Sequence, residues 1–498
     1  MNGWVAAVTH QDSAIRQFCA ARMEEQEQGR EWEHDDLGLH EIWSSLDFTN
    51  DTPPLDVDQF VDTFFNAEYY DNDHLQQQQL SNIDDDGRVY VEANTATMMN
   101  VAANVNGVDE GLQLVHLLLA CAEAVGCRDA QLAHSILNQI WPCVNPWGDS
   151  LQRVSHCFAM GLKSRLSLLQ NVNPNGSFSS NNIDASTITR EERNEAFALL
   201  HKTTPYIAFG FVAANDAICQ AAKGEESLHI IDLGMEHNLQ WPSMVKTLST
   251  RPEGPPKHVR ITGVIGDLDA AELEGSMRIL CKEAAAVGIS LEYSFVREQV
   301  SASTLTREKL GMEEAAVFVN SVMQLHRHVR ESRGSLKKIL QSIKKLGPKV
   351  VTVVEQDANH NGPFFLGRFL ESLHYYSAVF DSLDSSLPRG SGERMKIERW
   401  HLAEEICNVV ACEGDDRVER HERADQWRRQ LGRAGFQVMR LKCLDEAKAV
   451  VSGYGCDGYT VACEKGCLQL GWKGRPIMLA SAWHLNNLPS SSSSSNLI

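Results

Sequence analysis

Lysine is absent from the first 110 residues of this 498-residue chain. The same segment contains 23 aspartates and glutamates and only four arginines, whereas the remaining residues are close to neutral, although the whole chain carries a formal charge of −20. An acidic segment without counter-charges repels itself and repels a phosphate backbone. We therefore expect residues 1–110 to contact protein and not nucleic acid.

Signatures of metal modules, secretion and membrane insertion are also missing. The 13 cysteines form no pair of C-x2-C knuckles, which argues against zinc modules. Cys456, Cys463 and Cys467 are loosely grouped, and we predict buried or free thiols there in preference to a metal site. No secretory leader is evident, so we expect reduced, intracellular cysteines. No apolar run approaches the ~20 residues of a membrane helix.

Common catalytic motifs are absent too, and we predict no catalytic, cofactor or metal site. The chain contains no G-x-S-x-G elbow, no H-E-x-x-H pair and no P-loop. His326, His328 and His360 follow strand candidates, at the ends where α/β proteins bind ligands. Because neither a nucleophile nor a metal partner stands beside them, we favour hydrogen-bonded surface or cleft histidines.

Residues 1–107 mix acids, glutamines and scattered aromatic residues, a composition that rarely builds a core and that predicts disorder. Acidic and hydrophobic residues alternate there, which is typical of an activation segment that folds on a partner. A solubilising tail and a single amphipathic helix docked on the body remain equal alternatives. Residues 487–498 form a serine-rich tail that we also expect to be disordered.

We expect order to begin at Gly111 with a mainly helical region. The predicted helices span 111–126, 129–141, 149–170, 189–202 and 205–222. The first is apolar almost all round, which indicates burial between other helices. It contains an LxxLL pattern (Leu114, Leu117 and Leu118) that elsewhere docks in coactivator grooves, but core packing is the favoured interpretation.

From residue 227 onward, short apolar strands alternate with segments of helix length. The seven strand candidates are 228–232, 259–264, 289–295, 316–320, 350–355, 436–441 and 459–463. This order indicates a parallel sheet covered on both faces. The predicted fold class is α/β, a Rossmann-like, methyltransferase-type seven-stranded sheet with a helical cap.

The strand candidate at 228–232 consists of Leu228, His229, Ile230, Ile231 and Asp232. It resembles the VHIID motif of the GRAS family of plant transcriptional regulators, with Leu228 in place of the first valine. Residues 351–361 and 373–383, followed by 408–414 and 417–428, resemble its PFYRE region. The SAW motif is matched by Ser481, Ala482 and Trp483, and the two leucine-rich regions by 111–126 and about 272–300.

The resemblance covers residues 108–486, with a cap and first leucine-rich region at 108–222 and an α/β core at 227–486. It implies a SCARECROW-like nuclear protein that regulates transcription and pairs with other GRAS proteins or with zinc-finger factors of the indeterminate-domain type. Promoter DNA would be reached indirectly, and no membrane is implied. The DELLA and TVHYNP motifs are absent from residues 1–110, and the overall similarity is to the symbiosis-related branch with arbuscule-development regulators.

The methyltransferase resemblance raises the question of S-adenosylmethionine. A cofactor-binding turn needs glycines so that the backbone can approach the ligand closely. After Asp232 the chain offers only Gly234, and the acid expected at the end of the second strand has Asp267 as its only candidate. We therefore predict no cofactor and expect Asp232 to cap the following helix. An active methyltransferase remains the less favoured alternative.

Two basic segments are candidates for nucleic-acid contact, which would suit a direct DNA-binding homodimer. The first contains Lys337, Lys338, Lys344, Lys345 and Lys349, and a solvated amphipathic helix is its favoured interpretation. The second contains Arg417, Arg420, Arg423, Arg428, Arg429 and Arg433, interleaved with acids, which favours an ion-paired helix face.

Overall fold

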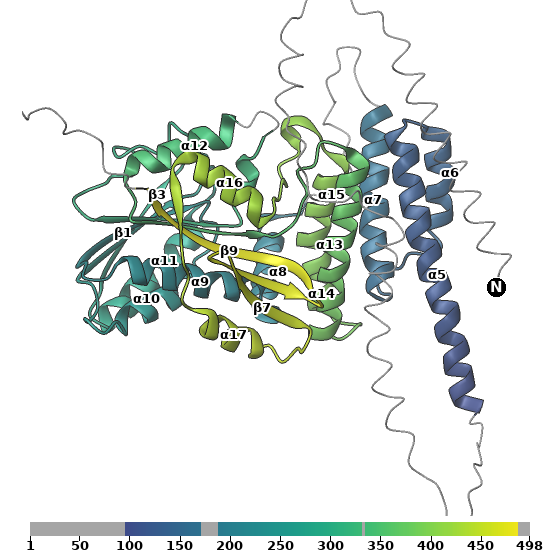
Figure 1. Ribbon diagram of the computed structural model, residues 1–498, viewed down its shortest axis with the longest axis horizontal. Helices are drawn as coiled ribbons and strands as arrows, with labels where there is room; N and C mark the ends of the chain where they lie inside the picture. Colours follow the sequence, from purple (N-terminus) through teal and green to yellow (C-terminus); the bar gives the residue numbers. More distant parts are fainter. Residues whose placement is uncertain (1–94, 171–187, 331–333, 487–498) are drawn as a thin grey trace, which may run out of the picture. The chain divides into compact units, whose positions relative to one another are not determined.

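Helix α5 (Thr95–Gly126) opens the described part of the chain. The computed structural model describes residues 95–170, 188–330 and 334–486, with side chains from residue 110, and all of them belong to one unit (Figure 1). The predictions for residues 1–94 and for the serine-rich tail lie outside the described residues. The predicted start at Gly111 is too late, because alanines and methionines in 95–110 favour continuation of the helix.

The four helices that follow α5 agree closely with prediction. They are α6 (Ala130–Ile140), α7 (Ser150–Gln170), α8 (Arg190–Thr203) and α9 (Pro205–Ala221). Their start signals are local, because Asp129 accepts a hydrogen bond from the backbone of Leu132 and Thr189 forms a capping box with Glu192. Helices α5 and α6 pack on α7, which packs on α13 and α15.

A single mixed sheet forms the centre of the described unit. Its strands are β1 (Ser227–Leu233), β2 (His258–Val264), β3 (Ser290–Val296), β4 (Ala316–Val322), β5 (Val350–Gln356), β6 (Phe436–Met439), β7 (Tyr459–Glu464), β8 (Cys467–Trp472) and β9 (Arg475–Leu485). The order is β3-β2-β1-β4-β5-β9-β8-β7, with β6 also paired to β9. Strands β1 to β5 are parallel, and β9 is antiparallel to β5.

The α/β class and the methyltransferase-like sheet are confirmed, but the predicted count of seven strands is too low. Strands β8 and β9 were missing from the prediction. Two Lys-Gly turns, Lys465-Gly466 and Lys473-Gly474, connect β7 to β8 and β8 to β9, and all four residues have positive φ. Positive φ at both central residues is the requirement of a tight type I′ hairpin. The C-terminal strands are therefore antiparallel hairpins and not further parallel units.

Helices cover both faces of the sheet (Figure 1). The remaining helices are α10 (Trp241–Ser249), α11 (Ala271–Ala286), α12 (Gly334–Leu346), α13 (Phe365–Ser386), α14 (Gly392–Ile397), α15 (Ala403–Ala411), α16 (Ala424–Ala434) and α17 (Leu444–Ser452), with short turns η2 (Leu325–His328), η3 (Glu398–Leu402) and η4 (Gly414–Asp416). Helices α12 and α16 bury one apolar core against the sheet, and α9, α10, α11 and α13 bury another.

A buried ion cluster joins the cap to the rest of the unit. Glu398 in the π-helical turn η3 accepts hydrogen bonds from Arg153 of α7 and Arg394 of α14, at 3.0 and 3.1 Å. Arg153 also reaches Asp384 of α13 at 2.7 Å. Charges that are buried together with their partners hold a fixed geometry, because removal of any one leaves an uncompensated charge. The position of α7 is thereby fixed relative to α13 and η3.

No helix in the ranges that the structure describes is long and apolar enough to cross a bilayer.

Candidate functional site

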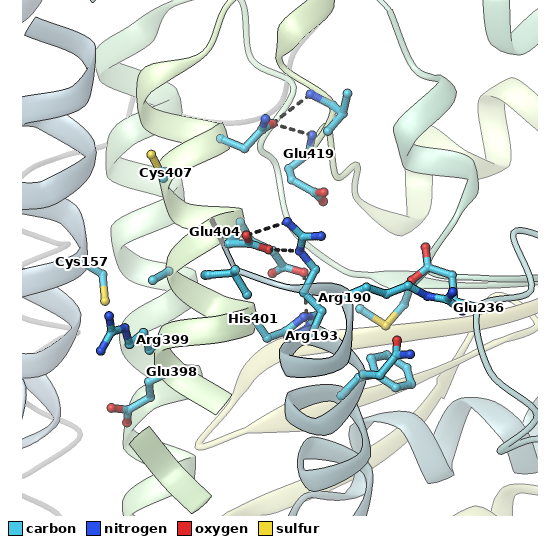
Figure 2. Close-up of a pocket in the computed structure, with 18 of the residues that line it drawn as sticks. Cys157, Arg190, Arg193, Glu236, Glu398, Arg399, His401, Glu404, Cys407 and Glu419 are labelled. Carbon is cyan, nitrogen blue, oxygen red and sulfur yellow. Dashed lines mark hydrogen bonds and ion pairs between the residues drawn. The ribbon is translucent and has the colours of Figure 1, made fainter. Parts of the chain in front are cut away.

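A cavity of about 1010 Å³ lies where the cap meets the carboxyl ends of the strands (Figure 2). Strand order reverses between β2 and β4, on the two sides of β1, and such a switch point is where open α/β sheets bind ligands. The walls come from α7, α8 and the η3–α15 segment, and from the loops after β1 and β4. Turn η3 is π-helical, and such turns are frequent at functional sites.

The loop after β1 makes a turn whose open side is already filled. Gly234 has φ +72 and lines the cavity, as a cofactor-binding glycine would. The side chain of Gln324, from the loop after β4, occupies the space beside Gly234 where a Cβ would stand. In this position the Gln324 side chain keeps a ligand away from the backbone of Gly234.

The second strand ends in the same way. Gly266 has φ +61, and the Gln299 side chain fills the space beside it. The predicted second acid, Asp267, is exposed and accepts a hydrogen bond from Gln299 Nε2 at 3.4 Å. At both turns a glutamine side chain thus occupies the space beside the glycine.

The predicted VHIID residues lie on β1. Leu228, Ile230 and Ile231 are buried in the apolar cores on the two faces of the sheet. His229 is buried, and its Nε2 lies 2.8 Å from Thr262 Oγ1 on β2. Burial lowers the pKa of His229 to about 4, with a further decrease from Arg260, so the imidazole is neutral. These residues build the sheet and do not face the cavity.

Asp232 does not cap a helix, contrary to the sequence prediction. Helix α10 begins after Gln240 without a side-chain cap, and the buried Asp232 carboxylate instead accepts a hydrogen bond from Asn320 Nδ2 at 2.9 Å. Asn320 also exchanges hydrogen bonds with Gln240 and accepts one from Thr352. Burial raises the pKa of Asp232 to about 7, against the opposing effect of Asn320. The carboxyl group therefore belongs to a buried polar network.

The charges around the cavity are largely paired. Arg193 of α8 makes two hydrogen bonds to Glu404 of α15, at 2.7 and 3.1 Å (Figure 2). Arg327 lies 3.4 Å from Glu236 and 3.6 Å from Glu419. Met323, in the wall beside them, has φ +53, an uncommon angle for a residue with a side chain. The cavity lining therefore carries no large excess of either charge, and apolar side chains such as Met160 and Phe197 also contribute to it.

Four more buried side chains lie together with Glu419 behind the cavity. His326 Nδ1 lies 2.6 Å from Glu355 Oε2, and His326 Nε2 lies 2.9 Å from Glu419 Oε2. His421 Nε2 is 3.4 Å from the same Glu419 oxygen, and its Nδ1 is 2.9 Å from His360 Nδ1. We call Glu355, His326, Glu419, His421 and His360 the His–Glu cluster.

Electrostatics within the His–Glu cluster are dominated by two carboxylates. Burial alone would lower the pKa of His326, but Glu355 and Glu419 outweigh it and raise the pKa to about 9. Burial and the neighbouring His421 hold the pKa of His360 well below its ordinary value. The prediction of hydrogen-bonded surface or cleft histidines is confirmed for His326, which lines the cavity, whereas His360 is hydrogen-bonded but buried and does not line it. His328 is half-buried in η2 and does not line the cavity.

Sequence reasoning missed the roles of Glu419 and His421. Both lie between η4 and α16 in a stretch without regular structure, so no periodic pattern drew attention to them. The amino-acid composition could have indicated these two residues, because a glutamate and a histidine stand two positions apart after the buried strand β5 and the helix α15. Asn408 fixes this stretch by accepting hydrogen bonds from the backbone N–H groups of Val418 and Glu419.

The LxxLL residues lie on α5, where Leu114 and Leu118 are buried in the core and Leu117 is half-buried. The SAW residues lie on β9. Trp483 is buried, its Nε1 donates to Ser481 Oγ at 3.0 Å, and Ser481 Oγ donates to the Val353 carbonyl on β5. Ala482 is buried opposite Thr352. The SAW segment thus holds β9, the strand on which it lies, against β5.

The two basic segments come together on one face. Lys337, Lys338, Lys344 and Lys345 are all exposed on α12, which packs on α16. Figure 1 shows the two helices side by side over the sheet. Exposed Arg429 and Arg433 of α16 extend this α12–α16 basic surface.

The predicted ion-paired arginine helix face is only partly correct. Arg417 and Arg420 are buried and precede α16, so they do not belong to a helix face. Arg428 pairs with Asp425 as predicted. Among the loosely grouped cysteines, Cys467 is buried, Cys456 is half-buried and Cys463 is exposed, and all three are free thiols.

Comparison with known proteins agrees with this architecture. The model of the GRAS domain family matches residues 114–484. The chain is 45% identical to "GRAS family protein RAD1" of Lotus japonicus over 77% of this chain and 76% of that protein. It is 45% identical to RAD1 of Medicago truncatula (75% and 73%) and 38% identical to "DELLA protein GAI1" of Vitis vinifera (79% and 65%). The crystal structure of SCL7 from Oryza sativa superposes with a TM-score of 0.66 at 29% identity, over 74% of this chain and 99% of that one.

Replacement of Asp232 by asparagine should change how stability depends on pH. A carboxyl group whose pKa rises from 3.8 to about 7 on folding contributes stability below pH ~4 and loses it as pH rises to about 7. The amide introduced by D232N keeps an oxygen for Asn320 but carries no charge. Relative to the parent protein, D232N should gain stability between pH 5 and pH 8, by at most about 4 kcal/mol.

Urea unfolding at pH 5, 6.5 and 8 measures this difference. The exposed Asp267→Asn variant is the control and should stay within about 0.5 kcal/mol of the parent at each pH. A D232N stability that runs parallel to the parent across this range would show that Asp232 ionises normally in the folded protein.

Proposed function

Because the chain belongs to the GRAS domain family, we propose that it regulates transcription in the plant nucleus through protein–protein contacts and does not act as an enzyme. The observation that carries this proposal is the pair of filled glycine turns. Gln324 and Gln299 stand beside Gly234 and Gly266, where a methyltransferase would admit its cofactor. A fold of this type without cofactor access is a rigid scaffold, and its outer surfaces are then what partners recognise.

The relatives support a place within the family. Identity is 45% to the two RAD1 proteins and 38% to the DELLA protein GAI1, in keeping with the missing DELLA and TVHYNP motifs. We propose a role in symbiosis or development, with other GRAS proteins and zinc-finger factors as partners. Contact with promoter DNA would then be made through those factors.

The acidic segment supports a division of labour. Residues 1–110 carry 23 acids and no lysine, which suits an activation segment that docks on basic or apolar surfaces of the transcription machinery. The folded unit would select the partner, and the acidic segment would deliver activation. Helix α5 starts at Thr95, so a truncation that respects the fold removes residues 1–94.

Removal of residues 1–94 should separate the two activities. Reporter activation by a fusion to an unrelated DNA-binding domain should fall to background, because the remaining chain is close to neutral. Pull-down of a GRAS or zinc-finger partner should keep its affinity within about twofold. Undiminished activation by the truncated chain would remove the acidic segment from the mechanism.

Calorimetry with S-adenosylmethionine tests the scaffold interpretation directly. We expect no saturable heat up to millimolar ligand, because the glutamine side chains occupy both turns. The Gln324→Gly variant controls for the blocking side chain, and the exposed Gln437→Gly variant on β6 controls for the substitution itself. Saturable micromolar binding by the unmodified protein would favour the methyltransferase alternative.

The α12–α16 basic surface supports a second candidate function, direct contact with DNA. Each phosphate that the protein neutralises contributes about −0.9 to the slope of log K against log salt concentration. If this surface binds DNA, replacing Lys337, Lys338, Lys344 and Lys345 by glutamine should make the slope of log K against log salt less negative by up to about 4. Lys282→Gln on α11, an exposed lysine outside this surface, is the control.

Gel shifts at several salt concentrations supply these affinities. A folded quadruple variant with an unchanged slope would exclude the α12–α16 surface as the DNA contact. Tight, sequence-specific binding by the chain alone, abolished in the variant, would instead favour the DNA-binding alternative over the scaffold.

A further inference from the structure

We propose that the His–Glu cluster contains a binding site for one divalent transition-metal ion, with His326 Nε2, Glu419 Oε2 and His421 Nε2 as ligands. One ligand atom from each of the three residues lies within 4.8 Å of the other two, and the three residues are buried. The set of two imidazoles and one carboxylate is the ligand set of catalytic zinc sites and of non-haem iron sites.

The distances between the ligand atoms suit a metal. Bonds of about 2.0–2.1 Å at tetrahedral angles separate neighbouring ligand atoms by about 3.3 Å. Glu419 Oε2 lies 2.9 Å from His326 Nε2 and 3.4 Å from His421 Nε2. The rings of His326 and His421 lie beside each other, with centroids 4.4 Å apart, so both imidazoles reach the same carboxylate.

The buried Nε2 of His421 lacks a well-formed hydrogen bond. His421 is 1% exposed, and the 3.4 Å contact of its Nε2 with Glu419 Oε2 does not have hydrogen-bonding geometry. Buried polar atoms without a partner are rare, because the lost hydration is not replaced. A metal ion between Nε2 and the Glu419 carboxylate would supply the missing interaction.

The outer partners hold both imidazoles in the orientation that a metal requires. Glu355 Oε2 accepts a hydrogen bond from His326 Nδ1, and the backbone N–H groups of Leu325 and His326 fix Glu355 Oε1. His421 Nδ1 faces His360 Nδ1 at 2.9 Å, so a proton on His421 Nδ1 leaves Nε2 free to coordinate. Metal-binding histidines almost always donate their second N–H in this way.

The cavity gives the metal ion a route in and an open position. His326 and Glu419 both line it, and Arg327 lies beside Glu419 Oε1, which leaves Oε2 for the metal. The fourth ligand would be water from the cavity. Binding would exchange the His326 Nε2–H bond for a nitrogen–metal bond and release that proton to solvent.

The cavity thiols compete weakly for the same ion. Burial raises the pKa of Cys157, Cys407 and Cys412, so these groups remain protonated thiols, whereas metals bind thiolates. Two imidazole ligands favour zinc, iron or cobalt over calcium and magnesium. A bound ion would join the loop after β4 to the stretch before α16, on the wall that faces the cap.

Metal titration of the full chain tests the proposal. After treatment with EDTA, the protein should bind one equivalent of Zn²⁺, measured by calorimetry and elemental analysis. With Co²⁺ it should show visible d–d bands without a thiolate charge-transfer band. The Glu419→Gln variant, which keeps the shape of the side chain, should weaken binding at least about 100-fold, and His360→Ala about 10- to 100-fold.

The exposed His258→Asn variant is the matched control and should bind as the parent does. Absence of stoichiometric binding, equal binding by folded Glu419→Gln, or a thiolate band with Co²⁺ would each overturn the proposal. The Co²⁺ spectrum of the unmodified chain decides the matter even where a variant fails to fold. No binding would mean that a proton alone bridges His326 and Glu419.

Discussion

The side-chain amide of Asn320 is the constraint on which the carboxyl edge of the sheet depends. Its nitrogen donates to Asp232 and Gln240, and its oxygen accepts from Gln240 and Thr352. An amide offers two donors and two acceptor positions, and all four are used here. Because the group is fully buried, loss of any one bond would leave a polar atom unpaired. The amide thereby fixes β1, β4, β5 and the start of α10 relative to one another.

The course of the loops follows from that fixed edge. The chain leaves β1 at Leu233 and turns at Gly234, and the loop after β4 brings Gln324 into the space beside it. The cap closes the other side through Arg153 and Arg193, which pair with Glu398 and Glu404. Arg153 is buried and its pair is rigid, whereas Arg193 is half exposed and contributes little to stability. The cavity between the loops and the cap therefore results from how the sheet edge and the cap are held in place.

The helices and strands could be predicted from local sequence signals, whereas contacts between residues far apart in the sequence could not. Near-continuous apolar runs such as β5, buried at every position, indicated a parallel sheet from the sequence alone. The Lys-Gly turns carry an equally local signal for β8 and β9, but this signal indicates antiparallel hairpins and not parallel units. The His–Glu cluster is different, because His326 and Glu419 are 93 positions apart in the sequence and meet only through the fold. The sequence placed His326 and His360 at strand ends without revealing what they face.

The His–Glu cluster places two carboxylates and three imidazoles in the interior of the protein. Apolar residues of similar volume would be at least as stable as buried carboxylates and imidazoles, so stability alone does not account for them. Glutamine side chains occupy the space beside both glycine turns, and the same loop after β4 brings His326 into a cluster of two carboxylates and three histidines. Such a network specifies one arrangement of the loops that carry it, because partial satisfaction would be costly. A metal ion shared by His326, Glu419 and His421 would strengthen that specification, since it fixes three side chains from two segments at a single point.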